Sequence, residues 1–392
     1  MKIKKIAFIG AGLSSAVIAR QLAEGQRVQC TLFDKRNHIG GNCHTARDGE
    51  TGVMRHTYGS HIFHTSNQEV WDYVNRFATF GPFVNRIKAE TPRGTFSLPI
   101  NLLTINQFFG TNLRPKEAEQ FLRKLAEPFR DGREKNFEET ALSLVGEELY
   151  RNFFYGYTKK QWGCEPAALP GSIVKRLPLR FNYDDNYYRD TYQGIPYDGY
   201  TAMIEKILDH PSIEVKLGHA FDPGEAPAFD HVISAGPLDA WYGFRHGRLS
   251  YRTVSWTDER LDGDAQGVAC LYYTSEKVPH TRTIEHKHFT PWEKHARTLL
   301  STEYSKATEP HDEPYYPVRS ERDLALLKEY VAEAKAEGGA GPSFVGRLGT
   351  YRYLDMHIVI EESLAFAAKA LAALNEGRDW PRFSVAEEKL FE

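Results

Sequence analysis

The sequence has few cysteines, no cluster of basic residues and no long apolar run, and each shortage excludes a class of protein. The four cysteines among 392 residues lack metal-ligand spacing, which favours reduced thiols in a cytoplasmic protein over a zinc site or disulfides. A formal net charge of −3 predicts no nucleic-acid or membrane-surface partner. No apolar run reaches membrane-spanning length, and the N-terminal apolar run is typical of a first strand, not of a signal peptide.

A glycine turn near the N-terminus predicts a dinucleotide site. The turn follows an apolar strand: Gly10 permits the tight bend, and Gly12 lets the backbone approach a diphosphate at the start of a helix. A second strand, residues 28–33, ends on Asp34, where an acid binds a ribose hydroxyl. Ser15 stands at the third glycine position and loosens the helix–strand packing there.

Two further motifs follow Asp34. The adjacent glycines Gly40 and Gly41 indicate a second close approach of backbone to ligand, which suits a flavin dinucleotide better than NAD. His61 and His64 are typical of an ordinary polar turn, and we expect no metal site because no carboxylate lies nearby at ligand spacing.

The middle of the chain predicts a helical insertion over residues 105–163. The aromatic run at its end is either a core stripe or a base-stacking platform; the interrupting glycines Gly156 and Gly163 favour the platform. Residues 175–187 mix cations and phenols, which suits either a diphosphate site or a surface salt-bridge cluster.

The remaining elements predicted from the pattern are a helix over 66–80, strands over 84–89, 95–98, 231–235, 268–273, 282–288 and 344–347, and helices over 200–208 and 357–374. Asp355, just before the last of these helices, is an acid at a helix N-terminus. That position also suits a group facing a flavin ring, and the two interpretations are compatible.

Taken together, these residues resemble the prokaryotic UDP-galactopyranose mutase family nearly end to end. The motifs that carry the resemblance are Gly10-Ala11-Gly12 with Asp34, Gly40-Gly41-Asn42, Gly59-Ser60-His61-Ile62-Phe63-His64-Thr65, Tyr157-Thr158-Lys159-Lys160-Gln161-Trp162-Gly163, Arg176-Leu177-Pro178, Phe181-Asn182-Tyr183-Asp184-Asp185-Asn186-Tyr187 and Gly346-Arg347-Leu348-Gly349-Thr350-Tyr351-Arg352-Tyr353-Leu354-Asp355-Met356.

The resemblance implies an α/β fold in three domains, with the substrate in the cleft between them. The expected ranges are 1–80, 197–245 and 335–392 for a discontinuous FAD-binding Rossmann-like domain, 100–165 for a helical domain with a mobile substrate loop near 162–185, and 81–99, 186–196 and 246–334 for an antiparallel sheet domain.

The implied activity is that of a flavin-dependent isomerase. In the family, reduced FAD attacks the anomeric carbon of UDP-galactose through N5, the adduct opens as an iminium, and the sugar recloses as a furanose without net redox. The resemblance also implies a flavin reductant, a homodimer, a cytoplasmic location and a role in galactofuranose biosynthesis for cell-surface polysaccharide.

Site residues follow from the resemblance position by position. Arg176 and Arg282 would clamp the diphosphate, and His61 and His64 would lie beside the flavin as further catalytic residues. The expected cofactor-binding residues are Gly10, Gly12, Leu13, Ser14, Asp34, Lys35, Gly41, Asn42, His61, Ile62, Arg347, Leu354, Asp355 and Met356. The expected substrate-binding residues are Asn85, Phe153, Phe154, Tyr157, Thr158, Trp162, Arg176, Tyr187, Arg282, Glu303, Tyr316 and Tyr353.

Besides Ser15, three positions depart from the family pattern: Ser60 replaces a usual proline, Tyr272 a frequent asparagine, and His357 a frequent acid. These changes leave the sugar open, with UDP-galactose first and another nucleotide-sugar, deoxy or amino-substituted, second. An amine-oxidase-like FAD oxidoreductase and a binding protein without chemistry are further alternatives. Both are disfavoured, because Arg176 and Arg282 retain the diphosphate clamp and the flavin contacts are present.

Overall fold

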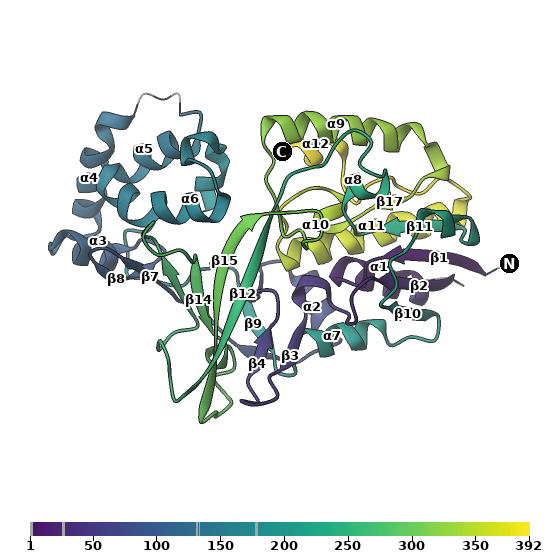
Figure 1. Ribbon diagram of the computed structural model, residues 1–392, viewed down its shortest axis with the longest axis horizontal. Helices are drawn as coiled ribbons and strands as arrows, with labels where there is room; N and C mark the ends of the chain where they lie inside the picture. Colours follow the sequence, from purple (N-terminus) through teal and green to yellow (C-terminus); the bar gives the residue numbers. More distant parts are fainter. Residues whose placement is uncertain (1–2, 26–27, 131, 133, 177–178) are drawn as a thin grey trace.

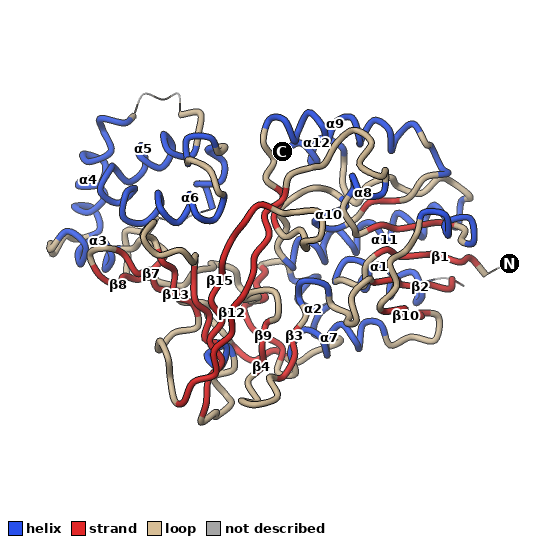
Figure 2. Tube along the Cα trace, viewed as in Figure 1, coloured by secondary structure: helices blue, strands red, loops and turns tan. Residues whose placement is uncertain are grey.

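A computed structural model describes residues 3–25, 28–130, 132, 134–176 and 179–392, without the side chains of Ser172, Lys175, Arg176 and Ala340. The chain forms three parts along its long axis: a group of helices, a central twisted sheet, and a parallel sheet covered by helices (Figure 1). Both chain ends lie in the part with the parallel sheet. The central twisted sheet stands between that part and the group of helices (Figure 2).

The parallel sheet confirms the predicted Rossmann-like α/β fold. Its strand order is β10-β2-β1-β11-β17, and every neighbouring pair is parallel. The glycine turn follows the central strand at its carboxyl end, where ligands bind in such sheets. The strands are β1 (Lys4–Ile9), β2 (Val28–Asp34), β10 (Ile213–Leu217), β11 (His231–Ser234) and β17 (Ser343–Phe344).

Alternating residues of the central strand fill two different cores. Ile6 and Phe8 join the large core that includes helices α1, α7 and α11, whereas Ala7 packs with Val232 on the opposite face. This two-sided burial explains why β1 is an almost continuous apolar run. The helices of this part are α1 (Leu13–Gly25), α7 (Gly199–Leu208), α8 (Leu238–Trp241), α9 (Glu321–Ala336), α10 (Gly346–Gly349), α11 (Met356–Glu376) and α12 (Glu387–Phe391).

The central sheet has the order β16-β12-β15-β14-β13-β7-β8. It is antiparallel as predicted, except that β13 and β7 run parallel. The register of β14 and β15 places Arg282 directly opposite Glu303. The strands are β7 (Ile87–Thr91), β8 (Gly94–Leu98), β12 (Tyr251–Asp262), β13 (Cys270–Tyr273), β14 (Arg282–Glu285), β15 (Arg297–Ala307) and β16 (Tyr316–Pro317).

The helical part has a core of its own, which includes Phe108, Phe137 and Phe153 and extends to Phe96 of β8. Its elements are α3 (Leu102–Phe109), α4 (Pro115–Ala126), α5 (Phe137–Leu149), a π-helical segment η3 (Tyr150–Tyr155), α6 (Gly156–Trp162) and the 3-10 helix η5 (Gly171–Arg176). Near the parallel sheet lie α2 (Gln68–Asn75) and the short strands β3 (Thr45–Arg47), β4 (Met54–His56), β5 (Phe63–Thr65), β6 (Phe80–Pro82) and β9 (Tyr192–Pro196). No described helix is long and apolar enough to cross a membrane.

Several predicted boundaries are wrong. The strand predicted over 84–89 spans Ile87–Thr91, because its pairing with β8 runs over those residues. The helix predicted over 66–80 begins after its cap at Asn67 and ends at Asn75, because the chain then forms β6 against β9. The strand predicted over 344–347 stops at Phe344, because Gly346, at φ 69°, starts the short helix α10. The strand over 282–288 ends at Glu285 and continues as the 3-10 helix η7 (His286–Phe289).

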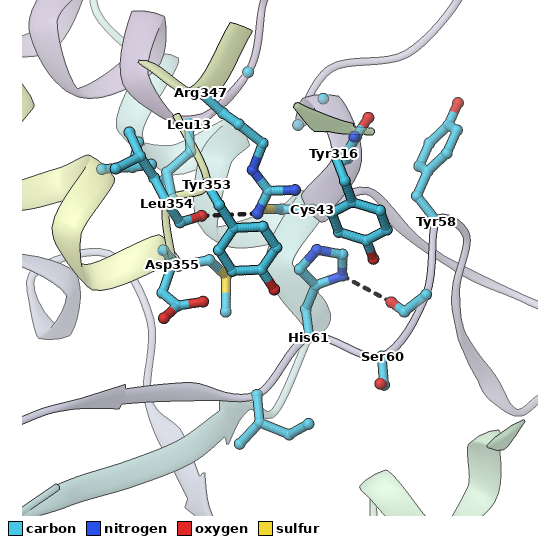
Figure 3. A pocket seen from close by; sticks show the side chains of 18 of the residues that line it. Leu13, Cys43, Tyr58, Ser60, His61, Tyr316, Arg347, Tyr353, Leu354 and Asp355 are labelled. Carbon is cyan, nitrogen blue, oxygen red and sulfur yellow. Dashed lines mark hydrogen bonds between the residues drawn. The ribbon is translucent and has the colours of Figure 1, made fainter. Parts of the chain in front are cut away.

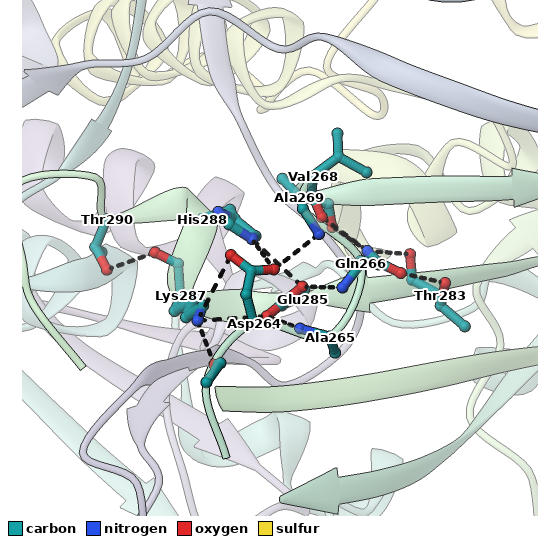
Figure 4. A network of polar contacts seen from close by, with 12 residues as sticks. Asp264, Ala265, Gln266, Val268, Ala269, Thr283, Glu285, Lys287, His288 and Thr290 are labelled. Atoms are coloured by element: carbon teal, nitrogen blue, oxygen red, sulfur yellow. Dashed lines mark hydrogen bonds and ion pairs between the residues drawn. The ribbon is translucent and has the colours of Figure 1, made fainter. Parts of the chain in front are cut away.

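A polar network ties η7 to the loop between β12 and β13 (Figure 4). The buried Glu285 carboxylate accepts hydrogen bonds from the backbone N–H groups of Ala265 and Gln266, at 2.9 and 2.8 Å. Lys287 lies 3.7 Å from both Glu285 and Asp264 and supplies the positive charge between them. The network is therefore an anchor that holds the end of the sheet.

Candidate functional site

Two glycine turns pack against each other at the start of α1. Gly10 and Gly41 have φ values of 94° and 57°, and the Gly40 N–H donates to the Ala11 carbonyl oxygen at 2.9 Å. A Cβ added at Gly41 would lie 3.1 Å from Gly12 Cα. The turns thus form one surface of bare backbone beside a helix N-terminus, which suits a diphosphate.

A cavity of about 270 Å³ opens over these turns. It brings together most of the residues predicted from widely separated motifs. The predicted residues that line it are Gly10, Gly12, Leu13, Ser14, Gly41, Asn42, His61, Ile62, His64, Asn85, Tyr187, Arg282, Tyr316, Arg347, Tyr353, Leu354, Asp355 and Met356. It is also lined by residues the prediction missed, among them Arg36, Cys43, Tyr58 and Tyr188.

Asp34 and Lys35 do not line this cavity. The buried Asp34 carboxylate accepts the Ala11 N–H at 3.0 Å and pairs with the Arg36 guanidinium. Burial raises the pKa of Asp34, but Arg36 outweighs burial and holds it below its ordinary value. Lys35 pairs with Glu313 at 2.6 Å. Arg36 therefore lines the cavity where the Asp34 carboxylate was expected. Ribose binding by Asp34 stays a prediction.

His61 is held with one nitrogen available to the cavity (Figure 3). Its Nδ1 lies 2.7 Å from the Gly59 carbonyl oxygen and must carry the proton to donate there. Burial, with Arg347 nearby, lowers the pKa of His61 to about 4. The imidazole is therefore neutral at pH 7, and its Nε2 is an acceptor.

Arg347 and Asp355 line the same cavity beside His61 (Figure 3). Arg347 Nη2 donates to the Leu354 carbonyl oxygen at 2.7 Å, and its guanidinium lies over the Tyr353 ring at 4.9 Å. Asp355 is the residue before α11, so the N-terminus of that long helix is directed to the cavity wall.

A second cavity of about 500 Å³ lies beside the first. The π-helical segment and α6 supply its aromatic wall, and Phe153 belongs to the helical core as well; base stacking on this wall stays a prediction. Its predicted lining residues are Phe153, Phe154, Tyr157, Thr158, Trp162, Tyr187, Arg282, Glu303, Tyr316 and Tyr353. The guanidinium-bearing Arg319, which the prediction missed, lies in the same wall.

Helix α6 is fastened to the central sheet. The Lys160 ammonium group donates to the carbonyl oxygens of Tyr273, His280 and Val278, at 2.7, 2.8 and 3.0 Å. At the end of the helix, Arg252 donates to the Gln161 carbonyl oxygen at 2.9 Å.

The sequence predicts Trp162 on a mobile loop, but the structure places it on this fastened helix. The loop begins one residue later, at Gly163.

The two cavities meet at one arginine and four tyrosines. The residues that line both are Tyr187, Tyr272, Arg282, Tyr316 and Tyr353. Arg282 binds Glu303 through Nε and Nη2, at 2.9 and 2.6 Å, and its Nη1 donates to the Tyr272 hydroxyl at 3.1 Å. Nη1 also lies 3.4 Å from Ser60 Oγ, so two of the departing positions contact the arginine.

The phenols of Tyr187, Tyr272 and Tyr316 remain protonated at neutral pH. Burial raises the pKa of Tyr187 to about 12 and raises those of Tyr272 and Tyr316 further. For Arg282, burial lowers the pKa, but Glu303 and the tyrosines outweigh burial, and the net pKa lies well above the ordinary value. The junction therefore offers a permanent cation surrounded by hydroxyl donors, which is chemistry that stabilises a diphosphate.

The comparison with family models decides the family. The model described as UDP-galactopyranose mutase matches residues 152–353, and a NAD(P)-binding Rossmann-like model matches residues 9–77. A probable UDP-galactopyranose mutase from Klebsiella pneumoniae is 49% identical over 98% of this chain and 99% of its own. The chain belongs to the UDP-galactopyranose mutase family. The family consists of flavin-dependent enzymes, so the predicted family and enzyme class are confirmed.

Two further proteins are similar to this chain, one in sequence and one in fold. A dTDP-fucopyranose mutase from Escherichia coli is 44% identical over 93% of this chain and 98% of its own. A crystal structure of reduced UDP-galactopyranose mutase matches 99% of both chains with a TM-score of 0.70 at 17% identity, a likeness of fold.

One predicted clamp residue cannot be placed in the site. Arg176 ends the 3-10 helix η5, and its side chain lies outside what the structure describes. The diphosphate role of Arg176 therefore stays a prediction from the resemblance.

Proposed function

We propose that this enzyme interconverts UDP-galactopyranose and UDP-galactofuranose with reduced FAD as its cofactor. The observation that carries the proposal is the meeting of a glycine-lined cavity and an aromatic-lined cavity at Arg282 and its ring of hydroxyl donors. The bare backbone of Gly12 and Gly41 fits a dinucleotide diphosphate, since a Cβ at Gly41 would press on the neighbouring turn. Bound reduced FAD would supply the N5 nucleophile for covalent exchange at the anomeric carbon.

The chain's own residues would hold the substrate and stabilise its leaving group. Trp162 and Tyr157 would contact the uridine in the second cavity. At the junction, Arg282 would neutralise charge that develops on the diphosphate as the anomeric bond breaks, while Tyr316 and Tyr353 donate hydrogen bonds to it. One Glu303 oxygen accepts from both Nε and Nη2 of Arg282, so the cation is oriented before substrate arrives.

The test is product analysis with dithionite-reduced protein and UDP-galactofuranose under anaerobic conditions. We expect UDP-galactopyranose as product, no product from the oxidised protein, and flavin that is still reduced after many turnovers. In the oxidised control, formation of an oxidised sugar together with reduction of the flavin would instead identify an amine-oxidase-like oxidoreductase. A folded yellow protein that converts neither this substrate nor other nucleotide furanoses would overturn the proposal.

A second candidate substrate is a dTDP-linked deoxy sugar. The relative named dTDP-fucopyranose mutase and the contacts of Ser60 and Tyr272 with Arg282 favour testing it. We would compare kcat/KM for UDP-galactofuranose and dTDP-fucofuranose in the wild type, in Tyr272→Asn and in the control Tyr272→Phe. A preference for the dTDP substrate that Tyr272→Asn reverses would make the deoxy sugar the natural one; a preference for UDP-galactofuranose would exclude it.

The cellular setting follows from the same proposal. We propose a cytoplasmic homodimer, served by a flavin reductant, whose product is used for cell-surface polysaccharide. Sedimentation velocity of the FAD-loaded protein tests the assembly, and a monomer at micromolar concentration would contradict it.

A further inference from the structure

A histidine–carboxylate pair lies at the edge of the cofactor cavity and involves a residue to which the site so far gives no role. His64, on β5, lines the cavity, and its Nδ1 lies 2.7 Å from Asp190 Oδ2. Asp190 is 126 positions away in the sequence, and the pairing of β5 with β9 brings the two together. The second carboxylate oxygen of Asp190 accepts the Ser66 hydroxyl at 3.1 Å, so both oxygens are fixed.

The imidazole plane of His64 is also fixed. Tyr188 stacks on the ring with centroids 3.7 Å apart and planes 12° apart, and His357 meets it edge-on at 4.7 Å. The ring is 7% exposed. Within the described residues, Nε2 has no hydrogen-bond partner in the fold, and the cavity that His64 lines is the place where one can bind.

The contact with Asp190 selects the tautomer. A carboxylate only accepts hydrogen bonds, so the proton of a neutral His64 must be on Nδ1 and the lone pair on Nε2. A charge-assisted hydrogen bond of this kind contributes about 1.5–3 kcal/mol, enough to exclude the other tautomer. The same logic orients histidines through carboxylates in metal sites.

We propose that Asp190 is a positioning residue of the flavin site: through His64 Nδ1, it presents the Nε2 lone pair as an acceptor for an N–H group of the bound reduced cofactor. The proposal rests on the proposed function, because it requires a flavin in the cavity. A reduced flavin carries an additional N–H compared with the oxidised ring, so an acceptor at this position stabilises the reduced form selectively.

The first experiment measures the reduction potential of the FAD-loaded protein. One hydrogen bond of about 1.4 kcal/mol corresponds to a tenfold change in the ratio of affinities for reduced and oxidised FAD, or about 30 mV for two electrons. We expect Asp190→Asn to lower the potential by about that amount, because the amide can donate to Nδ1 and turn Nε2 into a donor. Asp190→Glu, which keeps the carboxylate, should recover part of the shift.

A matched control separates positioning from damage to the loop. Gln193 lies opposite His64 in the pairing of β5 with β9, and its side chain donates to the carbonyl oxygens of Asp190 and Tyr188, at 2.9 and 3.4 Å, with no described hydrogen bond to the His64 imidazole. Gln193→Ala should therefore leave the potential within a few millivolts of the wild type, a shift worth less than a twofold affinity ratio. An equal shift in Gln193→Ala and Asp190→Asn would overturn the proposal in favour of a purely structural role.

A double-mutant cycle provides the second readout. In the His64→Ala background, Asp190→Asn should produce no additional shift, because its effect passes through the imidazole. Full additivity of the two shifts would contradict the proposal.

The tautomer itself can be measured without the cofactor. In ¹⁵N-histidine-labelled protein, the His64 spectrum should show a protonated Nδ1 in the wild type and lose that signature in Asp190→Asn. If the protein bound no FAD, the proposed function would fail while this spectrum still reported on the pair. A wild-type spectrum with the proton on Nε2 would overturn the positioning role directly.

Discussion

Replacing Gly156 by alanine should stabilise α6 through helix propensity and destabilise it through a packing clash. The distances around Gly156 show that the clash is the larger effect. Gly156 is the first residue of α6, and a Cβ there would lie 2.2 Å from the Thr274 carbonyl oxygen and 3.0 Å from the Glu276 nitrogen. Both atoms are backbone, so the clash cannot be relieved by rotating a side chain. Propensity alone would stabilise the helix by about 1 kcal/mol.

The opposing terms are larger. Overpacking costs about 1–3 kcal/mol, and a contact this short belongs at the upper end. The turn that must move is also the one that Lys160 binds, and losing one such charged hydrogen bond costs about 1.5–3 kcal/mol. We therefore expect Gly156→Ala to lower the free energy of unfolding by about 3.5–5 kcal/mol and to raise KM, because Tyr157 and Trp162 move with the helix.

Urea unfolding and steady-state kinetics test both parts. Gly110→Ala is the matched control: its φ of 63° strains an alanine, but no atom lies within 4 Å of the added Cβ. It should cost about 1 kcal/mol through the left-handed backbone and leave KM unchanged. A Gly156→Ala protein as stable as the wild type, with unchanged KM, would refute the idea that close packing fastens α6 to the sheet.

Three other changes have separable outcomes. Arg282→Lys keeps a cation beside the buried Glu303 but loses the forked geometry; kcat should fall about 100- to 1,000-fold with FAD still bound, and flavin loss would show a misassigned role. Trp162→Ala should raise KM about tenfold without weakening FAD in a fluorescence titration, and equal losses would remove Trp162 from the substrate wall. Arg47 lowers the pKa of Glu293 to about 2 from an ordinary 4.5, so this pair stabilises the fold above about pH 4.5 and the contribution is lost as the pH falls toward 2. Between pH 4.5 and 2, the free energy of unfolding should fall less steeply with pH in Glu293→Gln than in the wild type. Parallel pH dependences of the two proteins would contradict the assignment.

Local patterns predicted the parts of the site that lie within one continuous segment. The glycine turn at Gly10, the second turn at Gly40 and the aromatic wall around Trp162 each have a composition with a direct physical meaning. The partners of Asp34 could not be predicted, because no pattern shows that the Ala11 N–H and Arg36 both bind its carboxylate.

Contacts between distant segments could not be predicted from pattern. Arg282 faces Glu303 because of one register in the central sheet. His64 meets Asp190 because β5, a strand of three residues, pairs with β9. A three-residue strand is too short for any periodic signal, so nothing in the sequence marks Asp190 as part of the site. The expected roles of Arg282 and Glu303 came from the family resemblance alone.

The order of strands in the parallel sheet has a consequence for synthesis of the protein. The central strand β1 ends at Ile9, but its neighbour β11 begins at His231, and the edge strand β17 comes only at Ser343. At roughly 5–20 residues per second, a ribosome needs on the order of 10–45 s to make the intervening 221 residues, and one edge of β1 stays unpaired throughout. Over the same period, the continuous segment that forms the helical part is synthesised, while the nascent N-terminal strand requires protection from aggregation. Because α11 supplies the last residues that line the cavity, the site for the cofactor is complete only after Val359 has been synthesised.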